Sequence, residues 1–341
     1  MQKILFGLLG ALCLFALAGC ASTGKPAEDP RYTLRKDLSY GSHERNLVDI
    51  SIPGAAAPGG VILFIHGGVW MYGGKENYPV FLDGFRDRFV VASMSHRYID
   101  ETVHINDLED DVAAAVAFIR EFCLLNNAEP GKLIIMGHSS GAHLAMLYAY
   151  KQLGNSPIPV AFCVDMAGPT DMGDIAFLYN FKKLGWEKFF YRLAEKMSGY
   201  QVVDGDVTGE GYSESGREML AAISPVYFVT PESPPTIIVH DVADKIVPYA
   251  NSAALAGVFN VYGIDHYFMA LYSGIGHFLG IKKIKGGALR YDKALEAWLV
   301  RVMNEYIGKY CGLKTAQKSK KSLRPEKNHG KIKGSVHLSE C

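Results

Sequence analysis

The sequence predicts an α/β fold in which a mainly parallel sheet is flanked by helices. Short runs that are apolar throughout, as in strands buried on both faces, alternate with longer runs whose apolar residues recur at helical spacing. Turns that contain glycine follow several of the apolar runs. Of the 341 residues, 49% are hydrophobic and 21% are charged, which is ordinary globular composition and argues against a disordered chain.

Residues 40–311 form one predicted domain, which is a normal size for a single large α/β unit. Val48, Ile50 and Ile52 alternate with other residues and predict a half-buried strand. The strands that we expect cover residues 46–53, 60–66, 88–94, 132–136, 160–166, 236–240 and 267–272. The helices that we expect cover residues 107–125, 140–150, 250–259 and 291–310.

Residues 172–222 interrupt this alternation between two strands and are rich in Phe, Tyr and Trp. Architectures of this kind often carry a lid at such a point, so we predict a helical, lid-like insertion that forms a pocket wall. The alternative is a peripheral insertion that packs only on itself.

The first nineteen residues are typical of an export leader. Lys3 precedes an apolar run at residues 4–18 that is short for a membrane-spanning helix. Small residues end the run before Cys20 and resemble the bacterial lipoprotein cleavage box. We therefore expect lipidation of Cys20 and a polar tether over residues 20–39. The protein would then be extracytoplasmic and anchored to a bacterial membrane, with the outer membrane or cell surface favoured over the cytoplasm; the alternative is a plain secretory leader.

Charge and cysteines exclude some function classes. Lys and Arg together number 35, as do Asp and Glu, so the whole chain gives no reason to expect a nucleic-acid partner. Residues 312–341 hold eight Lys or Arg and two Glu and lack periodicity, which predicts a basic, disordered tail. The six cysteines contain no CxxC pair, so no metal site is expected from them.

The nucleophile candidate is Ser139. It lies in Gly137-His138-Ser139-Ser140-Gly141, which has the G-x-S-x-G pattern between an expected strand and an expected helix. A sharp strand-to-helix turn exposes the serine hydroxyl, and flanking glycines permit the close backbone contacts of that turn.

The oxyanion-site candidate is His66-Gly67-Gly68-Val69-Trp70, at the end of an earlier strand. Acyl transfer passes through an oxyanion that backbone N–H groups stabilise. We expect the N–H groups of Gly68 and Val69, with Gly67 also possible, to act together with that of Ser140. His66 is expected to brace this loop.

The acid and base candidates follow later in the chain. Asp244 comes shortly after an apolar strand and before a Val-Pro pair, and it is our choice of acid, with Asp241 and then Asp171 as alternatives. His277 follows the last strand in a glycine-containing loop and is our choice of base. The other histidines near the motifs, at positions 138, 143 and 240, are interpreted as structural.

Together these motifs resemble the α/β-hydrolase superfamily over about residues 47–308. The similarity is greatest to the esterase/lipase-like branch with an HGGxW loop, which includes carboxylesterases, acetylxylan and feruloyl esterases, and arylformamidases. Position 241 is Asp, where family members commonly have Gly after the histidine. The resemblance implies a serine hydrolase that cleaves carboxylic esters on a Ser-His-Asp triad and needs no metal or organic cofactor. An amide hydrolase is the alternative, and a non-catalytic binding lipoprotein is a more distant one.

Overall fold

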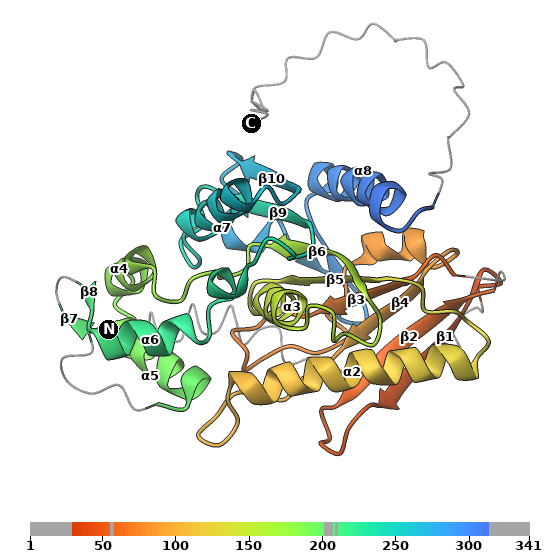
Figure 1. The fold of residues 1–341 in the computed structure, drawn as a ribbon, viewed down its shortest axis with the longest axis horizontal. Coiled ribbons are helices and arrows are strands. Elements are labelled where there is room, and N and C mark those ends of the chain that lie inside the picture. The colour runs from red at the N-terminus through yellow and green to blue at the C-terminus, as the bar shows by residue number, and fades with distance from the viewer. Residues whose placement is uncertain (1–28, 55–57, 201–206, 209–210, 314–341) are drawn as a thin grey trace, which may run out of the picture.

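The computed structural model describes residues 29–54, 58–200, 207–208 and 211–313. Its centre is an eight-stranded sheet with the order β1-β2-β4-β3-β5-β6-β9-β10 (Figure 1). The pairings of β1 with β2 and of β2 with β4 are antiparallel, and all others in this sheet are parallel. The strands are β1 (Tyr32–Ser39), β2 (Leu47–Pro53), β3 (Val61–Ile65), β4 (Val90–Met94), β5 (Leu133–His138), β6 (Val160–Met166), β9 (Thr236–Asp241) and β10 (His266–Leu271). The predicted mainly parallel sheet is confirmed.

Helices cover both faces of the sheet, which is why its central strands are buried throughout (Figure 1). One face packs against α2 (Ile105–Leu125), α3 (Ser140–Lys151) and α7 (Tyr249–Tyr262), and the other against η1 (Val80–Phe85) and α8 (Lys293–Tyr310). Side chains of a strand point alternately to the two faces. In β3, Leu63 joins the first core and Phe64 joins the second.

The helix boundaries follow local capping. Asp107 accepts a hydrogen bond from the backbone N–H of His104 at 2.8 Å, and this capping box starts α2 two residues before the expected position. The Asp292 carboxylate accepts from the N–H groups of Ala294 and Leu295, so α8 begins at Lys293.

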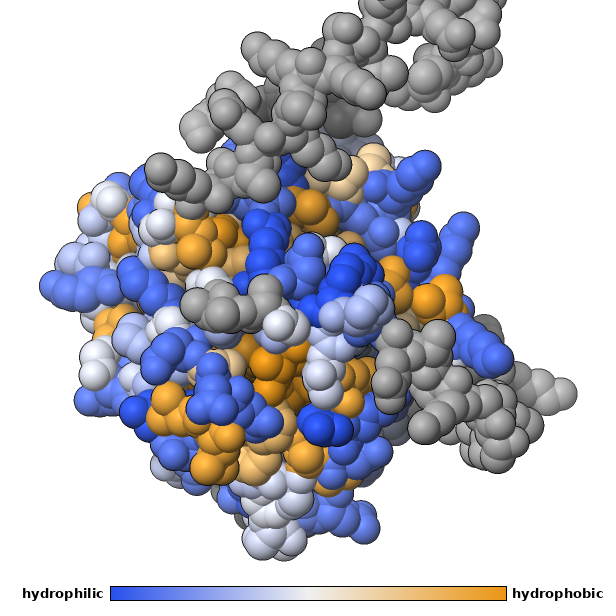
Figure 2. Space-filling model, turned by 90° about the vertical axis from the view of Figure 1, so that its right-hand side faces the viewer, coloured by the Kyte–Doolittle hydropathy of each residue, from blue (hydrophilic) through white to orange (hydrophobic). Residues whose placement is uncertain are grey.

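Strand β1 corrects the predicted tether. The tether over residues 20–39 is wrong for Tyr32–Ser39, which pair with β2 from Tyr32↔Pro53 to Ser39↔Leu47, with a register shift between Arg35 and Leu38. Most of β1 is exposed, so it shows no alternating apolar pattern. Charged side chains are common on such edge strands because they discourage pairing with other chains. Figure 2 shows the right-hand side of the view in Figure 1, where hydrophilic residues surround a hydrophobic patch.

The insertion at residues 172–222 is helical, as predicted. It contains α4 (Ile175–Lys183), α5 (Glu187–Ser198) and α6 (Glu214–Ala221), with the short strands β7 (Val207–Thr208) and β8 (Gly211–Tyr212) between them. It forms one end of the molecule (Figure 1). Phe177, Phe181 and Phe190 belong to the same core as α2 and α3, so the insertion does not pack only on itself.

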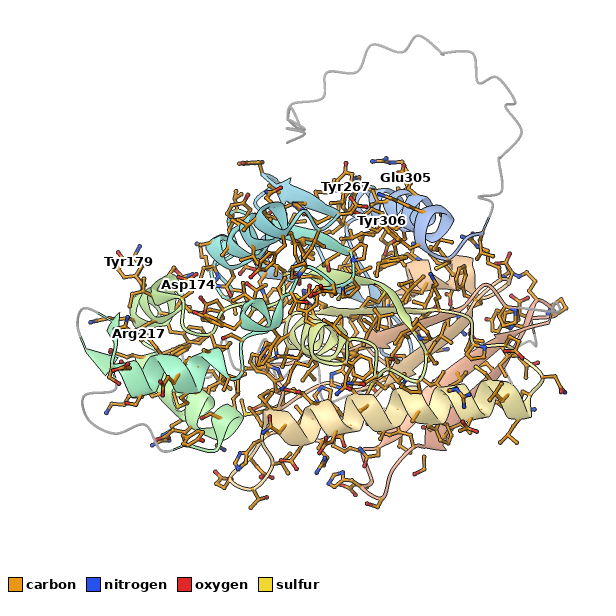
Figure 3. The ribbon with its side chains drawn as sticks, viewed as in Figure 1. Asp174, Tyr179, Arg217, Tyr267, Glu305 and Tyr306 are labelled. Carbon is orange, nitrogen blue, oxygen red and sulfur yellow. The ribbon has the colours of Figure 1, made fainter. Side chains whose placement is uncertain are left out.

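Hydrogen bonds join the start of the insertion to the body, and one of them reaches α7. The Asp174 carboxylate, labelled at α4 in Figure 3, accepts from the side chain of Asn251 on α7 at 2.8 Å. The predicted leader, Cys20 and the tail from residue 314 lie outside the described residues. Among the residues that are described, no helix is both long and apolar enough to cross a membrane.

Candidate active site

Ser139 occupies the sharp turn between β5 and α3. Its backbone has φ 56° and ψ −125°, a conformation that residues with a β-carbon rarely adopt. Two backbone hydrogen bonds hold the turn, from the N–H of Ser139 to Met166 O at 2.9 Å and from the N–H of His143 to Ser139 O at 3.1 Å. The strained turn directs the hydroxyl away from the helix that follows.

The turn needs glycine on its inner side. A β-carbon on Gly141 would lie 2.1 Å from Ile65 O and 2.4 Å from His66 O, both in the β3 segment. On Gly67, it would lie 2.7 Å from His138 O and 3.3 Å from the Ser139 Cβ. The loop that contains Gly67 and the turn at Ser139 are therefore in direct backbone contact, and no larger side chain fits between them.

The structure brings His277 and Asp244 to Ser139. His277 Nε2 lies 2.8 Å from Ser139 Oγ, and its Nδ1 lies 2.7 Å from Asp244 Oδ2. The three residues follow β5, β9 and β10, whose carboxyl ends meet at one edge of the parallel sheet. This arrangement lets the serine hydroxyl donate to one ring nitrogen while the other ring nitrogen donates to the carboxylate.

Asp244 is held as a carboxylate. Its Oδ1 accepts from the N–H groups of Ile246 and Val247, at 2.8 Å and 3.0 Å. Burial alone would raise the pKa of this carboxyl, but the neighbouring His277 and His240 lower it far below its usual range. Asp244 is therefore a charged carboxylate near neutral pH.

The two alternative acids lie elsewhere. Asp241 accepts from Ser273 Oγ at 2.9 Å and from the N–H of Ile275 at 3.2 Å, so it fixes the loop that carries His277. Asp171 accepts from the N–H of Gly173 and lies at the start of the insertion. Neither contacts the His277 ring among the interactions of the described residues.

The expected oxyanion donors surround the serine. Gly67, Gly68 and Val69 line the same cavity as Ser139, and Ser140 opens α3. Among the described residues, the N–H groups of Gly68, Val69 and Ser140 have no hydrogen-bond acceptor. Gly68 has φ 135° and Val69 has φ 54°, so the loop backbone departs from the conformations usual for strands and helices.

His66 lies beneath this loop and braces it. Its Nδ1 is 2.9 Å from Gly67 O, and its ring stacks on that of His96 with the centroids 4.4 Å apart. Burial lowers its pKa well below the usual value, which keeps the ring neutral. Trp70 is buried and donates from Nε1 to His143, so it packs inside the fold.

A cavity of about 260 Å³ opens in front of Ser139. The insertion contributes Phe181, Trp186 and Phe189 to its wall, as predicted for residues 172–222. The other lining residues are Gly67, Gly68, Val69, Tyr72, Gly73, Asn77, His138, Ser139, Ile246, His277, Phe278, Ile281 and Leu289. No Lys, Arg, Asp or Glu is among these described lining residues, so the cavity suits an uncharged, apolar group.

Two histidines that sequence reasoning treats as structural contact the site directly. His138 Nε2 is 2.9 Å from His277 O, and its buried ring has its pKa lowered by burial to about 3, so it is neutral. His240 Nε2 is 3.1 Å from Asp244 Oδ2. Their positions in the sequence could have indicated these contacts, because His138 precedes Ser139 and His240 is the residue before the last one of β9. No group of three or more metal-ligating side chains occurs among the described residues.

The sheet order and the strand–turn–helix at Ser139 define an α/β-hydrolase fold. The model of the BD-FAE family matches residues 48–259, more than half of the sequence. The chain belongs to this family.

The chain is also similar to curated proteins and solved structures that are named as esterases. The isoprenylcysteine alpha-carbonyl methylesterase ICME of Arabidopsis thaliana is 22% identical over 248 residues, covering 72% of this chain and 56% of the relative. Esterase LipQ of Mycobacterium tuberculosis is 27% identical over 248 residues, covering 68% of this chain and 54% of the relative. The chain thus spans about half the length of these two relatives.

Esterase B from Lactobacillus rhamnosis superposes with a TM-score of 0.67. The superposition covers 91% of this chain and 94% of the esterase, at 14% identity. This likeness shows that the fold is shared.

Proposed function

We propose that this protein hydrolyses carboxylic esters through an acyl-enzyme on Ser139. The observation that carries the proposal is the continuous contact from Ser139 Oγ to His277 Nε2, at 2.8 Å, and from His277 Nδ1 to Asp244 Oδ2, at 2.7 Å. The names of the relatives, which include a methylesterase and an esterase, support an ester substrate.

Each residue has a defined part in the reaction. His277 takes the serine proton as Oγ attacks the ester carbonyl carbon, and Asp244 stabilises the imidazolium that forms. The N–H groups of Gly68, Val69 and Ser140 stabilise the oxyanion. His277 then gives the proton to the leaving alcohol as the carbon–oxygen bond breaks. In the second half of the reaction, water attacks the acyl-enzyme with the same help from His277, and the carboxylic acid is released.

The cavity supports a preference for neutral esters with an apolar group. Aromatic side chains of the insertion form part of its wall, and a buried charge without a partner would be costly there. We infer that residues 172–222 act as a wall that sets substrate choice.

The test is active-site labelling followed by a substrate panel. A fluorophosphonate should label Ser139 in the folded protein, with Ser139→Ala as the control that loses the label. The panel compares p-nitrophenyl acetate, acetylated xylan, a feruloyl ester and N-formylkynurenine. Labelling at another residue would remove the basis of the proposal, and turnover of N-formylkynurenine alone would favour the amide reaction.

We also propose that a lipid on Cys20 anchors the protein to a bacterial membrane. The support is the apolar run of residues 4–18 and the small residues before Cys20. In a bacterial host grown with an alkyne fatty acid, the full chain should become labelled and enter the detergent phase. Cys20→Ser should abolish both, and Cys13→Ser, in the leader, should lose neither. Equal labelling of Cys20→Ser would contradict the anchor.

A further inference from the structure

His240 contacts Asp244 from the side that His277 does not occupy. Its ring is fully buried at the end of β9, with Nε2 3.1 Å from Asp244 Oδ2 and 3.0 Å from Val247 O. Both of these oxygens are acceptors, so Nε2 carries a hydrogen and donates. The other ring nitrogen, Nδ1, is 2.7 Å from Ser252 Oγ on α7.

The Asp244 carboxylate needs a compensating charge. Its side chain has no exposed surface, and an unpaired charge in such a place is costly. If His277 is to act as a base, its ring must be neutral in the free enzyme, so it supplies no positive charge at that stage. Among the described residues, His240 is the other ionisable side chain in hydrogen-bond contact with the carboxylate.

We propose that His240 is a positioning residue that holds Asp244 opposite His277 and carries the positive charge that balances this carboxylate in the free enzyme. The inference rests on the proposed role of Ser139, His277 and Asp244 in ester hydrolysis. It assigns a task to a histidine that does not line the cavity and therefore does not touch substrate.

The surroundings of His240 agree with this charge. The titratable groups that face it are Asp244, Asp165 on β6, His138 on β5 and Tyr249 on α7, and His277 lies on the other side of Asp244. Burial lowers the pKa of His138 to about 3 and raises that of Tyr249, so both are neutral near pH 7. Burial also raises the pKa of Asp165 to about 7.

The balance of effects on His240 itself favours its cationic form. Burial acts to lower the His240 pKa, but the hydrogen bond and charge of Asp244 outweigh burial and raise it. Ser252 Oγ is then an acceptor for the hydrogen on Nδ1, so each ring nitrogen of a cationic His240 has a partner.

A charge on His240 has a consequence for His277. Asp244 favours the protonated form of His277, and a cation on the far side of Asp244 offsets this effect. The pH dependence of the reaction therefore reports on the charge of His240 through Asp244.

The first experiment measures the pH dependence of kcat/KM. His240→Gln keeps a donor near Asp244 but removes the charge, and it should shift the acid limb upward by roughly 0.5 to 1 pH unit. Ser252→Ala should shift it in the same direction by less, because Nδ1 loses its acceptor. His143→Gln is the matched control, since His143 is equally buried but contacts Ile223 O and Trp70. Its limb should not move. An unmoved limb in both His240→Gln and Ser252→Ala would overturn the proposal.

The second experiment does not depend on turnover. With ¹⁵N-labelled histidine at pH 8, one of the eleven histidines should have both ring nitrogens protonated, and this signal should vanish in His240→Gln. A signal for two protonated nitrogens that survives in His240→Gln, or its absence in the wild-type protein, would contradict the charge on His240. Should the protein prove inactive on esters, this measurement would still report on His240, so failure of the proposed function and failure of this inference can be told apart.

Discussion

The backbone of Ser139 predicts an unusual order of stability for two variants of this proposed nucleophile. Ser139 has φ 56° and ψ −125°, which lies outside the left-handed helical region that side chains sometimes adopt. Holding a residue with a β-carbon there costs roughly 1–3 kcal/mol, and glycine avoids that cost. Ser139→Gly should therefore be more stable than Ser139→Ala, although glycine usually weakens a fold.

The size of the difference follows from three effects. Glycine loses about 0.5–1 kcal/mol through the greater freedom of the unfolded chain. Removing the β-carbon loses part of a methylene contact, which is worth at most about 0.8 kcal/mol when fully buried, and Ser139 is only half-buried. If the relieved strain is about 2 kcal/mol, the middle of the range given above, Ser139→Gly is more stable than Ser139→Ala by about 1 kcal/mol. The hydrogen bond to His277 is absent from both variants and cancels.

Urea unfolding followed by circular dichroism measures this difference in the free energy of unfolding. Ser140 supplies a matched control, because it is the next residue and lies in α3, where alanine is favoured over glycine. Ser140→Gly should be less stable than Ser140→Ala, the reverse of the order at Ser139. If Ser139→Gly were no more stable than Ser139→Ala, the turn would not store the strain that we assign to it.

Three further predictions concern activity and stability. Asp244→Asn should lower kcat on the order of 10⁴-fold with the fold intact, because the amide leaves His277 in the wrong tautomer, and a steady-state assay at pH 7 checks this. Trp186→Ala should raise the KM for an aryl or long-chain ester roughly tenfold and should change the KM for an acetate ester little. Tyr179 is exposed on α4 and lies outside the cavity (Figure 3), so Tyr179→Ala should change neither KM value. The free energy of unfolding should fall steeply as the pH is lowered, because four buried histidines are neutral in the fold but bind protons when the chain unfolds. The raised pKa of Asp165 reduces this fall, because its carboxyl holds a proton in the fold that it loses on unfolding. The four histidines, each with its pKa lowered chiefly by burial, are His66, His96, His138 and His143. Their folded pKa values lie below the unfolded value near 6.5, so the free energy of unfolding should fall by about 4 kcal/mol per pH unit from about pH 6 to pH 4. Urea unfolding at each pH measures this free energy. A free energy of unfolding that does not change over this range would contradict the buried neutral rings.

The parts of the site that the sequence predicts are those fixed by strand ends. Uninterrupted apolar runs identify β5 and β9 because both faces of a central strand are buried. The carboxyl ends of parallel strands meet at one edge, so residues that follow such runs come together. Ser139, Asp244 and His277 each follow a recognisable strand, and their positions in the chain were sufficient to predict their proximity.

The parts that the sequence does not predict depend on exposure or on contacts between distant segments. Strand β1 is missed because an exposed edge strand has no reason to alternate apolar and polar residues. The partner of His240 is missed for another reason. A histidine at a strand end indicates a polar contact but not which residue provides it, and Asp244 and Ser252 reach His240 only when the chain turns back after β9.

Asp241 shows how a departure from the common family pattern is accommodated. A carboxylate at this position, where the resemblance implies glycine, is an alternative candidate to Asp244 in the sequence. The structure directs it instead to the loop after β10, where it accepts from Ser273 Oγ and the N–H of Ile275, two residues before His277. The end of β9 and the turn after it therefore supply two acids with separate contacts, since Asp244 accepts from the His277 ring and Asp241 accepts from the loop that carries this ring. The position of His277 thus depends on both β9 and β10, and a change at Asp241 should act through the base and not through the nucleophile.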